Sequence, residues 1–253
     1  MNFFEQFGIA IKAYIKAISF VFNNGLWIYF IYPLLISLLL FFGGYALVHQ
    51  FSDFVQNWLM QIVNPYIANS SWLSYLTNIL SFVINILFAI IFYFFYSAIV
   101  KYIVLIIMSP VMALLSERAD EIITGKKYKF NFSQFLHDIL RGISIAIRNM
   151  LIELSIILFC FILVWIPIIG WLSPVFLLIV SYYFYGFSMI DYTSERRKLN
   201  VTESVAYIRK NKGLAIGNGF VFALVFAFPI IGAIVVAVLA PIAATIAVLE
   251  IEK

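Results

Sequence analysis

Long stretches without a charged side chain constrain this chain more than any other feature. Residues 26–48, 72–100 and 213–249 contain no Asp, Glu, Lys or Arg, and residues 149–190 contain only Glu153. Across the chain 64% of residues are apolar and 11% are charged, whereas soluble domains carry roughly a quarter charged residues. The runs predict an all-α integral membrane protein. No hydrophilic stretch is long enough to build a second core, so we expect one membrane domain, residues 1–253.

Two of the apolar runs carry the same phrase near their middle. It reads Pro167-Ile168-Ile169-Gly170 in one run and Pro229-Ile230-Ile231-Gly232 in the other. Proline removes a helical hydrogen bond and glycine tolerates the positive φ of a reversal, so each phrase predicts the tip of a buried helical hairpin. The arms before the tips, residues 151–166 and 213–228, measure about 24 Å, short of the roughly 30 Å of a bilayer core. This length favours re-entrant hairpins, and fully spanning hairpins remain the alternative.

The other two runs predict two long transmembrane helices, at residues 26–48 and 72–108. Apart from Lys101, every Lys and Arg precedes the first of these spans or follows the second. The positive-inside rule then predicts a multi-pass membrane protein with both termini in the cytoplasm. The net charge of +4 comes from basic loops between spans, so we expect lipid and not nucleic acid as the partner.

Amphipathic segments flank the runs. Residues 3–22 place Phe3, Phe7, Ile11 and similar residues at helical spacing, which predicts a helix in the membrane plane and not a signal peptide. Ser109-Pro110 predicts the start of a helix that ends at Gly125, with its charged residues on a solvated face. We expect further amphipathic helices at 133–150, leading into a hairpin arm, and at 203–212, capped by Thr202, and we expect Asp191 to end the first hairpin.

The order of four motifs resembles the CysZ family of bacterial sulfate permeases, which is similar in fold to the eukaryotic etoposide-induced membrane proteins. These motifs are "NNGLWIYFIYPLLISLLL", "IIMSPVMALLSERADEIITG", "FILVWIPIIGWLSPVF" and "FAFPIIGAI". The resemblance implies two long transmembrane helices and two hairpins that enter part of the bilayer, assembled as a homo-oligomer around a sulfate path. It also implies sulfate uptake for cysteine biosynthesis, without ATP hydrolysis by this chain.

The sequence departs from that family at its candidate anion site. CysZ proteins usually carry an arginine directly after Gly-Ile or Gly-Leu, whereas this chain continues Gly25-Leu26 with Trp27. Backbone N–H groups near Asn24, Gly25 and Leu26 still predict a site for an anion at a helix N-terminus, although an ordinary turn explains the same residues. The other candidate substrate-binding residues are Lys101, Arg118 and Asn218. A lysine at the membrane edge and an asparagine that packs helices are the alternatives for Lys101 and Asn218.

Basic residues on the predicted cytoplasmic side offer a wider set of cations to an anion: Lys12, Lys16, Lys101, Arg118, Arg141, Arg148 and Arg209.

Enzyme chemistry lacks the residues it needs. The two histidines, His49 and His137, fall on opposite sides of the membrane in this topology, and no zinc or phosphate-loop motif is present. We therefore expect no catalytic residue, no metal and no cofactor. Cys160 is the only cysteine, which excludes an intramolecular disulfide. The sequence predicts an anion permease, and the alternative is a non-transporting membrane scaffold or assembly factor of the same fold.

Overall fold

A computed structural model describes residues 1–36, 38, 102–103, 105–127, 131–163, 169–228 and 231–252. Every regular element in these ranges is helical, which confirms the all-α prediction. Unlabelled helical segments occupy residues 31–36 and 105–124. The labelled elements are α1 (Phe3–Asn23), the 3₁₀ helix η1 (Leu26–Phe30), α4 (Phe132–Leu163), α5 (Ile169–Arg196), α6 (Val201–Lys210), α7 (Lys212–Phe226) and α8 (Ile231–Ile251).

Three of the described helices are long and apolar enough to cross a membrane. They are Phe132–Cys160, Leu172–Arg196 and Ile231–Ile251, and the bent pair Phe3–Asn23 and Leu26–Ile36 makes a fourth if it counts as one span. α7 is apolar but shorter, at 15 residues. The first predicted span, 26–48, is described at 26–36 and 38, where it begins as the 3₁₀ helix η1, and most of the second, 72–108, lies outside the described residues together with Lys101.

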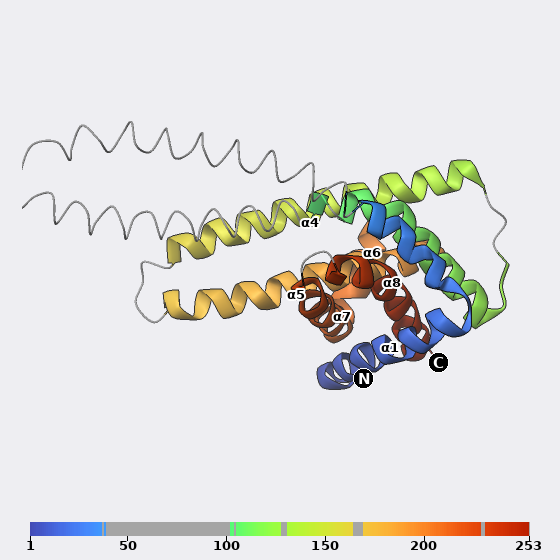
Figure 1. Cartoon of the computed structure of the whole chain (residues 1–253). Coiled ribbons are helices and arrows are strands. Elements are labelled where there is room, and N and C mark those ends of the chain that lie inside the picture. The colour runs from blue at the N-terminus through green and yellow to red at the C-terminus, as the bar shows by residue number, and fades with distance from the viewer. Residues whose placement is uncertain are drawn as a thin grey trace, which may run out of the picture.

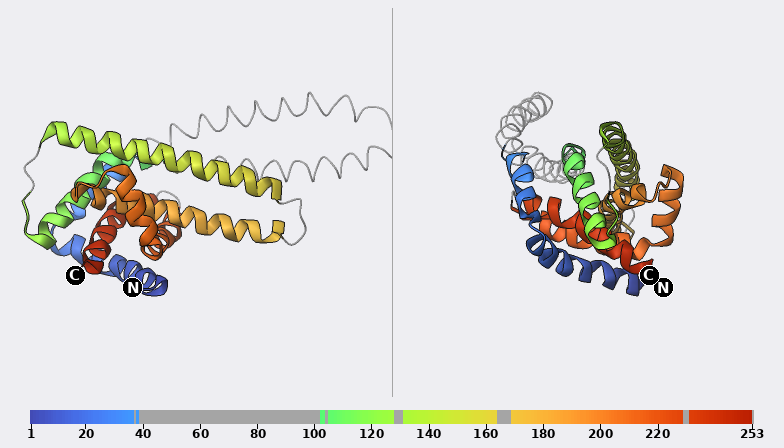
Figure 2. Two further views of the ribbon diagram at one scale, coloured as in Figure 1. Left: turned by 180° about the vertical axis from the view of Figure 1, so that it is seen from behind. Right: turned by 90° about the vertical axis from the view of Figure 1, so that its right-hand side faces the viewer.

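α4 and α5 form a long antiparallel hairpin that extends beyond the remaining helices (Figure 1, Figure 2). α4 is one continuous helix of 32 residues, about 48 Å long. The prediction of a separate amphipathic helix at 133–150 followed by a short arm was therefore wrong, because no proline interrupts the chain where the two join. α5 also continues past Asp191 to Arg196.

The shorter hairpin, α7 and α8, packs into the bundle beside α1 and α5. α5 and α7 cross closely, because glycines face the partner backbone. A Cβ on Gly186 would lie 1.9 Å from the Ala215 carbonyl oxygen, and one on Gly219 would lie 1.7 Å from that of Tyr182. No larger residue fits at either position without separating the helices.

α1 turns a face of small side chains toward α7 and α8. Ala10, Ala13 and Ala17 on this face are completely buried. Ile15 and Phe22, which belong to the apolar stripe that the sequence predicts, are instead 66% and 65% exposed. These two side chains face away from the protein, where an in-plane helix contacts lipid, whereas Phe3, Phe7 and Ile11 of the same stripe are half-buried against the protein.

Two predicted helix starts are wrong and one predicted end is confirmed. Ser109 and Pro110 lie inside the helix at 105–124, which Gly125 ends at a φ of +75°. α6 is capped by Asn200 and not by Thr202. Asn200 Oδ1 accepts a hydrogen bond from the Glu203 N–H (2.9 Å), while Glu203 Oε2 accepts one from the Asn200 N–H (2.8 Å). This reciprocal pair satisfies two backbone donors, which a cap at Thr202 does not.

Candidate anion site

The candidate site begins at the turn between α1 and η1. Gly25 has a φ of +69°, a left-handed conformation that favours glycine, and the chain bends there by 108°. Asn24 closes α1 by donating its Nδ2 hydrogen bond to the Phe20 carbonyl (2.8 Å). Asn24 and Gly25 are exposed, whereas the Leu26 side chain is buried and anchors η1. The turn therefore presents the N-terminus of a helical segment to an open surface.

Arg118 lies beside this segment. Its Nη1 donates to Glu121 Oε2 at 2.6 Å, and Tyr29 of η1 lies near enough to act on it electrostatically. The hydrogen bond to Glu121 raises the pKa of Arg118, and Tyr29 adds to the effect. The Arg118 side chain is 52% exposed. The structure thus brings together two of the sequence-predicted site elements, a permanent cation and the segment that follows Gly25.

Asn218 lies elsewhere, in the buried interface between α7 and α1. The Tyr14 hydroxyl donates to the Asn218 carbonyl oxygen at 3.1 Å. A Cβ on the neighbouring Gly217 would lie 2.8 Å from Ala10 Cβ, so small residues on both helices allow the close approach. The geometry favours the packing alternative for Asn218 over contact with an anion.

The hairpin tips are described only in part. Pro167 and Pro229 lie outside the described residues, whereas Gly170 and Gly232 are the second residues of α5 and α8. Gly232 is helical, so the prediction of a positive φ there was wrong. A Cβ on Gly232 would lie 1.9 Å from the Val225 carbonyl oxygen. Glycine is required there because α7 and α8 touch near their tip.

Six side chains form what we call the buried charge cluster. It joins the helix at 105–124 to α4 and α5, and its members are Glu117, Asp138, Arg141, Asp191, Glu195 and Arg196. Arg141 Nη2 contacts Asp191 Oδ1 at 3.1 Å. Arg196 Nη1 contacts Asp138 Oδ2 at 2.8 Å and Glu117 Oε2 at 3.4 Å. Burial raises the pKa of Glu117. These contacts link elements distant in sequence.

The cluster corrects the prediction of a solvated charged face on the helix that contains Glu117. Only part of that prediction is confirmed, by the local ion pair of Arg118 with Glu121. Sequence patterns missed the rest because the partners come from three different helices. One signal in the sequence could have found them. In an antiparallel hairpin with its tip at Pro167, residues equally far from the tip lie opposite each other, and Asp138 and Arg196 each lie 29 positions from Pro167.

Glu153 is a second buried carboxylate in the long hairpin. It is 1% exposed, and it accepts hydrogen bonds from the Tyr102 hydroxyl (2.6 Å) and the Ser181 hydroxyl (2.6 Å). One donor, Ser181, comes from α5, and the other, Tyr102, comes from the segment before the helix at 105–124. Glu153 therefore holds helices together at a depth where an unpaired charge is costly.

Most of the other candidate cations are engaged in local contacts. Lys16 pairs with Glu250 at 2.5 Å, and Arg141 is occupied by Asp191. The Arg148 guanidinium lies 5.8 Å from the centre of the Phe187 ring, and Arg209 lies near Tyr183. Arg118 lies near Tyr29, in the segment after Gly25.

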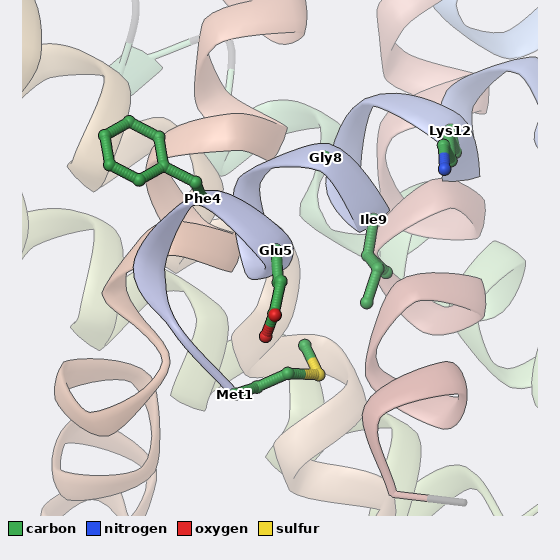
Figure 3. Close-up of a pocket in the computed structure, with 6 residues that line it drawn as sticks. All are labelled: Met1, Phe4, Glu5, Gly8, Ile9 and Lys12. Atoms are coloured by element: carbon green, nitrogen blue, oxygen red, sulfur yellow. The ribbon is translucent and has the colours of Figure 1, made fainter.

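A shallow depression on α1 lies apart from these groups. Figure 3 shows its lining residues, Met1, Phe4, Glu5, Gly8, Ile9 and Lys12. Its cation, Lys12, shares the depression with the carboxylate of Glu5, and most of the lining is apolar. These features do not match the needs of a doubly charged anion.

Comparison with known proteins shows which family the sequence matches. A family model described as "Sulfate transporter CysZ/Etoposide-induced protein 2.4" matches residues 13–237. The match includes the Gly25 turn, Arg118 and both predicted hairpin tips.

Similar proteins carry the same description. The chain is 24% identical over 219 residues to "Sulfate transporter CysZ" of Pseudomonas fluorescens (strain Pf0-1), covering 85% of this chain and 83% of that protein. It is 26% identical over 209 residues to "Sulfate transporter CysZ" of Vibrio parahaemolyticus, covering 81% of this chain and 80% of that protein. A protein of the same name from Pseudomonas syringae pv. tomato is 23% identical, with 85% and 82% covered.

Proposed function

The chain belongs to the family of sulfate transporter CysZ and etoposide-induced protein 2.4, and from this membership we propose that it is a membrane permease for sulfate or a related inorganic anion. The relatives that it matches are named sulfate transporters, and the chain has helices long and apolar enough to cross a bilayer. Its role is to supply sulfate to the assimilatory sulfur metabolism that makes cysteine. It is a transporter and not an enzyme.

The observation that best supports an anion site is the proximity of Arg118 to η1. The family places an arginine after Gly-Leu, and this chain has Trp27 there. We place Arg118 in the role of that missing cation, because it lies on the helix at 105–124 near Tyr29 of the same helical segment. A guanidinium offers paired N–H donors that match the oxygens of sulfate.

Glu121 already binds Arg118 and would repel an anion. The Arg118 side chain is 52% exposed, whereas that of Glu121 is 13% exposed. The exposed side of the guanidinium is therefore the part that an anion can reach, with Glu121 still bound on the other side. The first N–H groups of the segment after Gly25 lack helical partners and supply further donors. Asn24 and Gly25 border the bound anion, and the buried Leu26 keeps the segment in place.

The remaining predicted site residues have other roles in this proposal. Asn218 packs α7 against α1, and Lys101 anchors its helix at the inner membrane surface. The glycines at 170 and 232 and the prolines before them shape the hairpins. Large apolar side chains exposed on α4 and α5 contact lipid and further copies of the chain in a homo-oligomer: Leu151, Leu158, Phe159, Leu172, Val175 and Phe176.

We place both termini in the cytoplasm of a bacterium, with the chain in the inner membrane. The N- and C-terminal ends lie close together (Figure 1), and Lys16 of α1 pairs with Glu250 of α8. Glu252, just after α8, also accepts a hydrogen bond from Arg197 Nε at 2.9 Å. These contacts support one membrane side for α1, the C-terminal end of α8 and the basic segment after α5.

Sulfate uptake into liposomes tests the site. Labelled sulfate is added outside vesicles that contain the unmodified chain, Arg118→Gln or Lys210→Gln, and the label inside is measured over time. Loss of one charged hydrogen-bond donor costs about 1.5–3 kcal/mol, so Arg118→Gln should lower uptake at least about tenfold. Lys210 is exposed on α6, so its neutralisation should leave uptake within about twofold of the unmodified chain.

Equal uptake by the Arg118 and Lys210 variants contradicts the role of Arg118 but not transport itself. Uptake by the unmodified chain at the level of empty vesicles favours the scaffold alternative.

A further inference from the structure

Three metal-ligating side chains meet at the solvent-facing edge of the buried charge cluster. His137 and Asp138 come from α4, and Glu195 comes from the end of α5. His137 Nδ1 lies 3.9 Å from Asp138 Oδ1 and 3.9 Å from Glu195 Oε1, and the three ligand atoms lie within 4.8 Å of one another. The His137 side chain is 69% exposed, whereas those of Asp138 and Glu195 are 3% and 5% exposed. The site is thus buried on one side and open on the other.

Glu195 supplies an independent indication of a missing ligand. Its Oε1 is buried and has no hydrogen-bond partner among the described residues, and the whole residue is only 7% exposed. This oxygen is the one that faces His137. A buried carboxylate oxygen without a hydrogen-bond donor costs desolvation free energy, and a cation between Glu195 and His137 would offset that cost.

The charges around the site are also unbalanced. The buried charge cluster has four carboxyl groups and two guanidinium groups among the described residues. Arg141 is matched by Asp191, and Arg196 is shared between Asp138 and Glu117. Glu195 forms no ion pair with either guanidinium group, and burial together with the neighbouring Asp138 raises its pKa to about 8. A divalent cation at Glu195 therefore takes the place of a proton, in a cluster whose carboxyl groups outnumber its guanidinium groups by two.

We propose that His137, Asp138 and Glu195 bind a divalent transition-metal ion, zinc being the ion that fits best. Imidazole nitrogen with carboxylate oxygen is a usual zinc ligand set, whereas magnesium and calcium prefer oxygen alone. Zinc bonds of about 2.0–2.2 Å place neighbouring tetrahedral ligands about 3.4 Å apart, so the observed 3.9 Å requires only a small closure. Water completes the coordination on the side that His137 exposes.

Neighbouring groups already orient one of the ligands. Asp138 Oδ1 accepts a hydrogen bond from Gln134 Nε2 at 2.6 Å, and Asp138 Oδ2 accepts one from Arg196 Nη1 at 2.8 Å. Such partners of a metal-bound carboxylate fix its direction and are typical of built metal sites. Because the ligands come from α4 and α5, zinc joins the two helices where their charged ends meet. The site is independent of the proposed anion site.

Zinc titration of the purified full-length chain in detergent tests the site. The chain carries no histidine tag and is stripped with a chelator before calorimetry. We expect one zinc ion per chain and a higher melting temperature with zinc. His137→Ala should weaken zinc binding at least about tenfold and remove the zinc-dependent rise in melting temperature. His49→Ala changes the only other histidine and should leave zinc binding unchanged.

Glu195→Gln keeps the size of the side chain and should also weaken zinc binding. His137 is exposed, so its variant retains the fold and remains a valid test if Glu195→Gln is unstable. No stoichiometric binding by the unmodified chain overturns the site, as does equal affinity after His137→Ala. Binding that needs His137 but is unaffected in folded Glu195→Gln marks an adventitious surface ion and also overturns it. Sulfate uptake is measured separately and does not depend on any of these results.

Discussion

At the scale of single residues, glycine sets how closely the helices approach. Gly219 faces the backbone of α5, and a Cβ there would lie 2.8 Å from the Gly186 nitrogen as well as 1.7 Å from the Tyr182 oxygen. Gly219→Ala must therefore push α7 away from α5. We expect the variant to unfold at a lower temperature in detergent, with a loss of about 1–3 kcal/mol in the free energy of unfolding.

Gly8 is the matched control, because a Cβ at Gly8 meets nothing within 4 Å. Alanine favours a helix over glycine by about 0.5–1 kcal/mol, so Gly8→Ala should keep or raise the melting temperature. An equal loss of stability in the two variants contradicts the close crossing of α5 and α7. The glycines beside Asn218 already indicated a tight helix contact in the sequence, whereas the identity of the partner helix required the structure.

At the scale of elements, the sequence prediction and the structure differ in the residue that caps the start of α6. The sequence favoured Thr202 as the cap, and the structure has Asn200 with Glu203 in a reciprocal pair of hydrogen bonds. Asn200→Ala should cost about 1 kcal/mol of stability, and Thr202→Ala, inside the helix and exposed, should cost almost nothing. Thermal unfolding of both variants followed by circular dichroism makes the comparison. A larger loss for Thr202→Ala restores the original prediction.

The helical hairpins were predictable from sequence, whereas the side chains that contact one another across them were predictable only in part. Composition and the repeated proline-glycine phrase indicated the α4–α5 and α7–α8 pairs. Positions counted from Pro167 also match observed partners: Glu153 and Ser181 each lie 14 positions from it, and they share a hydrogen bond. The helix at 105–124 contributes Glu117 to the buried charge cluster, and no local sequence pattern predicts that position. Long-range packing therefore decided which charges became buried.

At the scale of the whole molecule, the two hairpins differ in reach. α4 is about 48 Å long, whereas α7 has 15 residues and is about 22 Å long, less than a bilayer core of about 30 Å. The sequence argument for short arms on both hairpins therefore holds for α7 and not for α4. We expect the tip between α7 and α8 to stay inside the membrane.

Cysteine labelling from outside the cell tests the depth of that tip. Ile230→Cys in a Cys160→Ala background should react slowly with a membrane-impermeant maleimide added outside, because α7 is too short to carry the tip across. Lys210→Cys, on the proposed cytoplasmic side, should react only after the membrane is permeabilised. Rapid labelling of Ile230→Cys in intact cells indicates a fully spanning hairpin instead.

The candidate anion site shows the limit of sequence at this largest scale. Gly25 and Arg118 were each identifiable from their motifs, yet they are 93 positions apart, and only the folded chain places Arg118 near Tyr29. In our proposal Arg118, which belongs to another helix, supplies the cation that this chain lacks after Gly25-Leu26.

Flux of labelled sulfate into liposomes that contain only this chain is the most direct test of an anion permease. Uptake should rise with time, saturate with external sulfate and exceed that of empty vesicles, since sulfate does not cross a bilayer core on its own. Unlabelled sulfate should compete with the label more strongly than chloride does. Uptake indistinguishable from that of empty vesicles, by protein shown to be folded and inserted, contradicts the permease function.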